Sequence, residues 1–306
     1  MFIIVLKQVF ILLILISTGV FAAKGKIITE AGAKCLTDLV LIVITPFVII
    51  KSLIRKFDSK TLYSLLICFA ITVLIHLLMI LLSKMFIHSR DKRCEKVLQF
   101  GSVFSNCGFM SIPLQQALLD EDGVLYGAAY VIIFNLLTWS YGIYLMSGDK
   151  KYISPKKMFA NPGIIGFVVG IIIFLFSLPI PNVAYSAIDY ISALYTPLPM
   201  LIIGYHISRS NILNSVKNPK CILAVLLRLL VFPLISLLAM YICGIKGTML
   251  ISTVISVSAP VAAVTTMFSS KFSIDTALSV DMVSLSTVLS LGTMPLVIAL
   301  ARYIGG

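Results

Sequence analysis

Two apolar stretches of the chain are interrupted by proline and small polar residues, which is the pattern of a broken membrane helix. The first, 105–113, contains Asn106, Gly108 and Pro113, and the second, 256–266, contains Pro260. Proline removes a backbone donor and disturbs the preceding helical turn. In a bilayer such a break persists only where protein or trapped water satisfies the freed groups, usually beside a cavity. The pattern therefore predicts two half-helix ends that face a binding site.

The chemistry that these breaks offer is recognition of a small anion. A helix that starts at a break presents N–H groups without partners and the positive end of its dipole, and both favour a carboxylate. Asn106 adds a side chain that donates and accepts, although a buried Asn can also serve only to join neighbouring helices. The residues of the two breaks that we predict to contact substrate are Ser105, Asn106, Gly108, Pro113, Ser258, Pro260 and Thr265.

The composition places these breaks in a membrane. The chain is 59% hydrophobic and 12% charged, with a mean hydropathy of +1.08, whereas soluble domains carry roughly 25% charged residues. A helix needs about 20 mostly apolar residues to cross a bilayer. We therefore predict an all-α polytopic protein of the lipid bilayer. The ten expected spans are 2–22, 33–53, 62–86, 97–118, 123–146, 161–178, 186–207, 219–243, 247–269 and 277–301.

The basic residues predict the sidedness of the chain. The net charge of +12 comes from short loops between the spans, which reflects the positive-inside bias and does not indicate nucleic acid as a partner. Most Lys and Arg residues then lie on the cytoplasmic side of the cell membrane, with both termini outside and the loop 51–60 as an exception. Lys24, Lys26 and Lys34 follow the first apolar run, so we expect no cleaved signal peptide.

The two halves of the chain share a plan. Pro46 in the second span corresponds to Pro197 in the seventh, and Pro113 in the fourth corresponds to Pro260 in the ninth, at nearly equal offsets. Each half has an odd number of spans, so the halves must enter the membrane from opposite sides as inverted repeats; chance recurrence of prolines is the alternative. The predicted organisation is a first repeat at 1–148, a cytoplasmic linker at 149–160 and a second repeat at 161–306.

A few ionisable residues fall within the predicted spans. A charged side chain at membrane depth is costly, so Arg228, Asp281 and Asp38 are candidates for function. Arg228 could attract an anion or pair with Asp281, and we favour the ion pair. Coupling to protons would need one of these carboxylates or a histidine, and His76 and His206 are more typical of hydrogen bonds between helices.

An ordered set of motifs resembles the auxin efflux carrier family, which includes plant PIN-FORMED proteins and bacterial malate and malonate permeases. The matches cover essentially the whole chain. They are 104–114, Phe134-Asn135, Trp139-Ser140, Asn161-Pro162 with Gly166 and Gly170, 196–200 with Gly204, 258–263, 284–287 and 293–296. One departure is Ser111, where the family pattern usually has a second glycine, so substrate identity does not carry over.

The resemblance implies ten helices in two inverted five-helix repeats, with the fourth and ninth helices crossing at their breaks. By position, Asn106 matches an asparagine at the crossover of the fourth helix, and Pro113 and Pro260 match the crossover prolines. Asn161 matches an asparagine near the substrate, and Asn135 belongs to the same set. The implied function is a secondary transporter that moves a small organic anion, such as a mono- or dicarboxylate, by alternating access.

Other functions leave less trace in the sequence. No HExxH, GxSxG or phosphate-binding glycine loop is present, so we expect no enzyme. The six cysteines lack metal-ligand spacing, so we expect no metal and no cofactor. A sodium-coupled symporter and a receptor without transport remain alternatives. The spacings Gly123-x3-Gly127 and Gly166-x3-Gly170 favour packing within the chain, with a homodimer as the other option.

Overall fold

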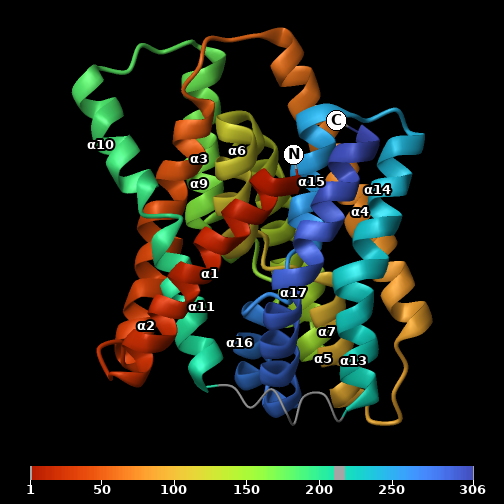
Figure 1. The fold of residues 1–306 in the computed structure, drawn as a ribbon. Coiled ribbons are helices and arrows are strands. Elements are labelled where there is room, and N and C mark those ends of the chain that lie inside the picture. Colours follow the sequence, from red (N-terminus) through yellow and green to blue (C-terminus); the bar gives the residue numbers. More distant parts are fainter. Residues whose placement is uncertain (1, 210–217, 306) are drawn as a thin grey trace.

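A computed structural model describes residues 2–209 and 218–305, and its regular elements are helices (Figure 1). The elements of the first half are α1 Phe2–Lys24, α2 Glu30–Asp38, η1 Leu39–Ile44, α3 Thr45–Leu53, α4 Ser59–Phe86, α5 Lys92–Val103, η2 Cys107–Ser111, α6 Ile112–Leu137, η3 Thr138–Gly142 and α7 Ile143–Ser147. Those of the second half are η4 Lys150–Tyr152, α8 Pro155–Phe159, α9 Pro162–Leu175, α10 Asn182–Ala193, α11 Pro197–Arg209, α13 Pro219–Leu226, η5 Leu227–Val231, α14 Phe232–Ile242, α15 Gly247–Ser258, α16 Val264–Lys271 and α17 Thr276–Gly305.

Within the described residues, six helices are long and apolar enough to cross a membrane. They are Glu30–Leu53, Ser59–Phe86, Cys107–Ser147, Asn182–Arg209, Pro219–Ile242 and Thr276–Gly305. The apolar helices Phe10–Lys24, Pro162–Leu175 and Gly247–Ser258 are shorter. The polytopic helical class is therefore confirmed, whereas ten spanning helices in two inverted repeats stay a prediction.

Two local features account for part of the difference from ten spans, in addition to the short helices Phe10–Lys24 and Pro162–Leu175. The predicted spans 97–118 and 247–269 are each divided by a stretch that is not helical, after Val103 and after Ser258. Conversely, α6 continues through a sharp turn at Asp120 (φ 54°, ψ −148°), so the predicted fourth and fifth spans appear as one element. Because the two helices are joined by the single residue Asp120, there is no loop between them that a sequence pattern could reveal.

The helices form two bundles, which stand left and right in Figure 1. In the first bundle α1 packs on α11, and α3 packs on α9 and α10. In the second, which we call the crossover bundle, α15 packs on α6, α14 and α17, and α4 packs on α5 and α6. The bundles meet mainly where α3 contacts α6 and where α1 contacts α17.

Glycine lets the helices of the first bundle approach closely. A Cβ atom on Gly204 of α11 would lie 2.1 Å from the carbonyl oxygen of Ile16 in α1. A Cβ atom on Gly166 of α9 would lie 2.6 Å from the Cα of Pro46 in α3. Only a residue without a side chain permits backbones to approach so closely, as is common between helices in membranes. The Gly166 spacing therefore packs within the chain, as its pattern favoured.

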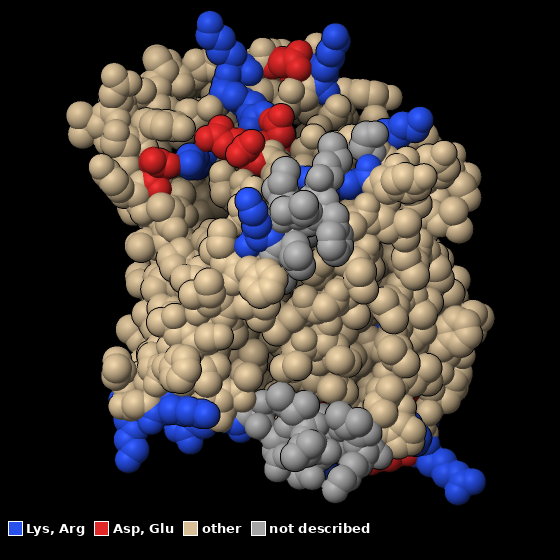
Figure 2. Space-filling view, viewed as in Figure 1, with Lys and Arg blue, Asp and Glu red and all other residues tan. Residues whose placement is uncertain are grey.

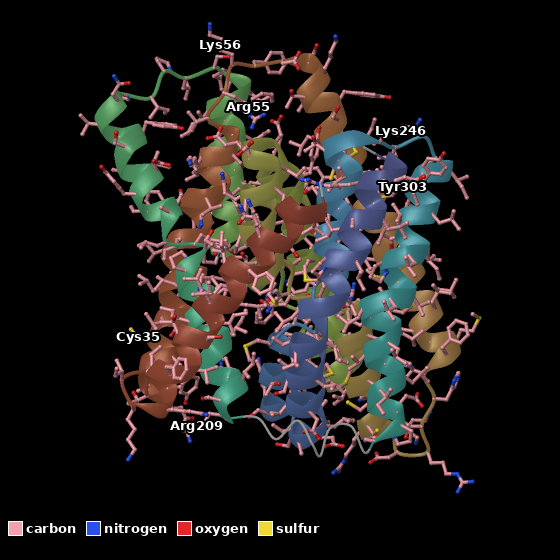
Figure 3. The ribbon with its side chains drawn as sticks, viewed as in Figure 1. Cys35, Arg55, Lys56, Arg209, Lys246 and Tyr303 are labelled. Atoms are coloured by element: carbon pink, nitrogen blue, oxygen red, sulfur yellow. The ribbon has the colours of Figure 1, made fainter. Side chains whose placement is uncertain are left out.

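Charged side chains are gathered mainly at the two ends of the molecule, with a broad band of uncharged residues between them (Figure 2). Arg55, Lys56 and Lys246 lie at one end, and Arg209 lies at the opposite end (Figure 3). The loop 51–60, which the charge pattern separates from most of the basic residues, thus lies at the opposite end from Arg209. Which end faces the cytoplasm stays a prediction.

Candidate functional site

The two broken helices lie against each other in the crossover bundle. After α5 ends at Val103 the chain is extended at Phe104 (φ −93°, ψ 109°). After α15 ends at Ser258 it is extended at Ala259 (φ −63°, ψ 150°). An antiparallel bridge joins Ser105 to Val261. The sequence predicted both breaks, and the structure brings them together at a crossover.

Each extended segment satisfies the backbone of the other. The amide of Asn106 donates to the carbonyl oxygen of Pro260 at 2.7 Å, and the amide of Ala262 donates to the carbonyl oxygen of Phe104 at 3.0 Å. Polar backbone away from water requires such partners. Pro260 itself has no N–H to satisfy. Two of the N–H groups expected to face an anion are thus used to hold the crossover together.

Side chains of neighbouring helices complete the crossover. Ser105 Oγ donates to the carbonyl oxygen of Ser256 at 2.9 Å, and Gln115 Nε2 donates to Ser256 Oγ at 2.8 Å. The amide of Val261 donates to Ser286 Oγ at 3.0 Å. All five residues are buried. Sequence reasoning missed Gln115 and Ser286, although a glutamine within an apolar run was a usable signal.

Proline does not mark the first break. Pro113 is buried in the first turn of α6, several residues beyond the extended segment. That position suits proline, because the first-turn N–H has no intrahelical acceptor. The break instead begins at Phe104, and the π-helical turn η2 leads from it into α6. In the second half, by contrast, Pro260 lies within the extended segment itself.

Asn106 and Gly108 are half-buried at the crossover, among neighbours that are mostly buried. A Cβ atom on Gly108 would lie 3.4 Å from the hydroxyl oxygen of Tyr195, which lies in the turn before α11. The first bundle therefore closes over this part of the crossover bundle. A small polar ligand at Asn106 would lie between the two bundles.

Asn135 and Asn161 meet across the same boundary. Nδ2 of Asn161 donates to Oδ1 of Asn135 at 3.1 Å, while Oδ1 of Asn161 accepts from the amide of Gly163 at 2.9 Å and caps α9. Both asparagines are half-buried. This pair joins α6 of the crossover bundle to α9 of the first bundle.

The remaining predicted contacts differ in position. Ser258 Oγ donates to the carbonyl oxygen of Val254 at 2.6 Å within its own helix. Thr265 is fully buried in α16, and its hydroxyl has no partner among the described residues. Asp38 is exposed at the end of α2, outside the crossover. The structure therefore does not bring Asp38 to the site.

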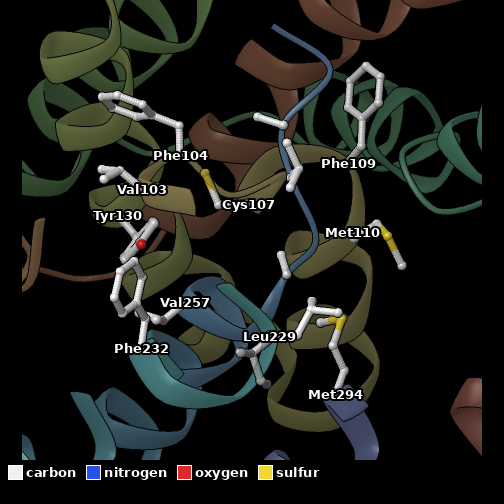
Figure 4. Close-up of a cluster of buried hydrophobic side chains, with 14 of the residues drawn as sticks. Val103, Phe104, Cys107, Phe109, Met110, Tyr130, Leu229, Phe232, Val257 and Met294 are labelled. Carbon is white, nitrogen blue, oxygen red and sulfur yellow. The ribbon is translucent and has the colours of Figure 1, made fainter. Parts of the chain in front are cut away.

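Arg228 in η5 is fully buried beside the crossover. Its Nη1 donates to the carbonyl oxygens of Val103 at 2.7 Å and Ser102 at 3.2 Å, and its Nη2 donates to that of Val257. Figure 4 shows Val103 and Val257 in one cluster with Leu229 and Phe232, which follow Arg228 in the chain. Insertion of an arginine costs roughly 2.5–3.5 kcal/mol. Hydrogen bonds to a charged group contribute about 1.5–3 kcal/mol each, so these bonds offset that cost.

These bonds differ from the ion pair that the sequence favoured. The guanidinium of Arg228 donates to backbone carbonyls of α5 and α15 rather than to the carboxylate of Asp281. Asp281 is half-buried in α17. The carbonyl acceptors exist only because both helices stop there, which a reading of single spans could not reveal.

A small group of buried polar atoms lies near Arg228. His76 Nδ1 bonds the carbonyl oxygen of Thr72 at 2.8 Å in its own helix, and its ring centroid lies 4.8 Å from that of Tyr130. Within the described residues, His76 Nε2, the Tyr130 hydroxyl and Arg228 Nε are buried without partners. Such atoms are commonly served by water or ligand. His206, the other candidate histidine, is exposed.

Ion pairs join the two bundles at one end. Lys51 Nζ lies 2.7 Å from Asp189 Oδ1 and 3.8 Å from Glu121 Oε1, and Arg55 pairs with Asp122. Three consecutive acidic residues are typical of a solvated loop, but the acidic turn 120–122 here pairs with basic residues of 51–60. A cavity of about 400 Å³ lies beside it, and another of about 660 Å³ lies between α14 and α17.

The chain is similar to a family of membrane transport proteins over nearly its full length. The model of a family described as "Membrane transport protein" matches residues 4–298. An uncharacterized transporter of Methanothermobacter thermautotrophicus is 26% identical over 298 residues, which cover 95% of this chain and 96% of the relative. An uncharacterized transporter of Methanocaldococcus jannaschii is 25% identical over 307 residues, with 97% of each chain covered. The chain belongs to this membrane transport protein family, the auxin efflux carrier family that its motifs resemble.

Proposed function

We propose that the protein is a secondary transporter that carries a small organic anion, such as a mono- or dicarboxylate, across the cell membrane by alternating access. The observation that carries the proposal is the crossover of two broken helices with Asn106 beside it. Interrupted helices that meet in this way form the substrate sites of many transporters. No covalent chemistry is required of any residue.

The proposed architecture is ten spans in two inverted repeats, with both termini outside. Its support is the reciprocal packing of the first bundle, in which α1 packs on α11 and α9 packs on α3. The first span of each half thus contacts the second span of the other. The exchange between Phe104 and Ala262 and between Asn106 and Pro260 repeats this reciprocity at the crossover.

The substrate in this proposal lies between the bundles, where it contacts Asn106, the backbone at Gly108 and the pair Asn135–Asn161. An amide side chain can donate to a carboxylate without adding a fixed counter-charge. Such an anion can be driven by the membrane potential alone, because moving one charge through 100 mV supplies about 2.3 kcal/mol. Motion of one bundle against the other would expose the site to either side.

Counterflow in proteoliposomes tests this function. The proteoliposomes are loaded with malate, malonate, lactate or indole acetate, and exchange is measured with and without an imposed membrane potential or pH gradient. We expect exchange of at least one of these anions. Asn106→Ala is expected to abolish exchange while the protein still inserts and remains monodisperse, and Asn182→Ala, at an exposed position of α10, is expected to leave it unchanged. Normal exchange by Asn106→Ala would remove Asn106 from the site.

A further inference from the structure

The C-terminal ends of both half-helices converge on one guanidinium group. Val103 is the last residue of α5, and Val257 lies in the last turn of α15. Carbonyl groups in a last helical turn lack intrahelical donors and carry the negative end of the helix dipole. Arg228 donates to both of them and also to Ser102. A single side chain therefore serves the negative ends of two helices.

Backbone carbonyls at the ends of broken helices are the groups with which transporters coordinate a coupling sodium ion. A bound ion at such a place enters from one side and leaves on the other, so its gradient drives the substrate. In this chain the corresponding oxygen atoms are already occupied by Arg228, whose side chain is fully buried. The guanidinium is attached to the chain and cannot leave.

We propose that Arg228 is a resident cation of the crossover, which takes the place of a coupling ion and makes transport independent of sodium. The inference rests on the proposed function and concerns only how that transport is driven. Arg228 acts as a positioning residue, because its bonds end on the helices that lead into the two extended segments. With this charge in place, the crossover needs no ion from solution, whether the site is open to one side of the membrane or to the other.

The first experiment uses the unmodified protein. Initial rates of anion counterflow are measured in proteoliposomes with sodium on both sides and again with choline in its place. The expected rates agree within about twofold. A rate that falls about tenfold or more in choline and recovers with added sodium overturns the inference alone. Lack of exchange in both salts overturns the proposed function, and this inference with it.

The second experiment varies the charge at position 228. Arg228→Met should lower the initial rate at least about tenfold, and Arg228→Lys, which keeps a positive charge and three donors, should recover most of that loss. If Arg228 acted only through the bulk of its side chain, the Arg228→Met variant would exchange anions at least as fast as the Arg228→Lys variant. A folded Arg228→Met variant that exchanges anions at the original rate overturns the inference. Should Met prevent folding, the salt comparison and the Lys variant still decide.

Arg302 provides the matched control. Its Nη2 also donates to a helix carbonyl, that of Leu118, at 2.8 Å, but it lies near the end of α17 and outside the crossover. Arg302→Gln should therefore leave both the rate and its indifference to sodium unchanged. Size-exclusion chromatography of each variant before reconstitution shows that equal amounts of folded protein are compared.

Discussion

At the boundary between the bundles, Asn161 makes two separate hydrogen bonds whose effects can be distinguished by substitution. Its Oδ1 caps α9 by accepting from Gly163, while its Nδ2 donates to Asn135. Serine is also a good N-cap residue but cannot reach across as an amide donor. A substitution by serine therefore removes the second hydrogen bond and keeps the first.

We expect Asn161→Ser to raise the KM for the transported anion about tenfold, which corresponds to one lost hydrogen bond of the stronger kind. The melting temperature in detergent should hardly change, since the cap persists. Asn218 offers the same substitution away from the site, because it caps α13 through its Oδ1. The KM is measured from uptake by Asn161→Ser and Asn218→Ser at increasing anion concentrations. An unchanged KM in Asn161→Ser would place the pair Asn135–Asn161 outside the substrate path.

Residue types predicted part of this site. Asn106, Ser105 and Pro260 were recognisable because small polar residues and proline are conspicuous inside apolar sequence. The partners of Arg228 depend on how η5 lies against α5 and α15, and the bond from Gln115 to Ser256 depends on how α6 lies against α15. That register is a property of packing between segments far apart in sequence, so no local pattern contains it.

At the scale of the helix, close approach in the first bundle depends on glycine. A Cβ atom at Gly204 would lie 2.1 Å from the carbonyl oxygen of Ile16, and backbone atoms cannot yield as a flexible side chain would. Overpacking of this kind costs about 1–3 kcal/mol. We expect Gly204→Ala to lower the melting temperature in detergent and to broaden the size-exclusion peak.

Gly292 in α17 is the control for that substitution. A Cβ atom there meets nothing within 4 Å, and alanine in a helix interior is more favourable than glycine by roughly 0.5–1 kcal/mol. Gly292→Ala should therefore keep or raise the melting temperature. Equal behaviour of the two alanine variants would show that α1 and α11 are not packed as closely as described.

Element boundaries were predictable only where a loop or a charge separates the helices. The limits of α4 lie close to the expected span 62–86. The turn at Asp120 was not expected as a joint within a helix, because three acidic residues normally indicate a solvated loop. The first break was expected within 105–113 and begins one residue earlier, at Phe104. Pro113 lies in the first turn of α6, a position with which proline is compatible.

At the scale of the whole molecule, alternating access requires that contacts between the bundles break. Arg55 of the loop after α3 pairs with Asp122 of α6, across the boundary. Lys51 and Asp189 lie on α3 and α10, within the first bundle. The two pairs lie at the same end of the molecule and therefore report on different motions.

We expect a short bifunctional methanethiosulfonate cross-linker between Arg55→Cys and Asp122→Cys to stop anion exchange, and reduction to restore it. The same cross-linker between Lys51→Cys and Asp189→Cys should be tolerated, because it joins helices that move together. A cross-linker is used because these positions meet through long side chains, whereas a direct disulfide needs the two Cβ atoms to lie close together. The exposed cysteines Cys35 and Cys243 are replaced by serine in both variants. Exchange that continues with the 55–122 pair cross-linked would mean that these parts of the bundles stay fixed during transport.

The reciprocal bonding at the crossover also constrains the order in which the chain can be completed. Until Pro260 and Ala262 have been synthesised and inserted, the amide of Asn106 and the carbonyl of Phe104 lack the partners that they have in the finished protein. Unsatisfied backbone in lipid costs several kcal/mol per group. The open break of the first half therefore needs water or another protein as its hydrogen-bond partner until α15 and the segment that follows it have been made.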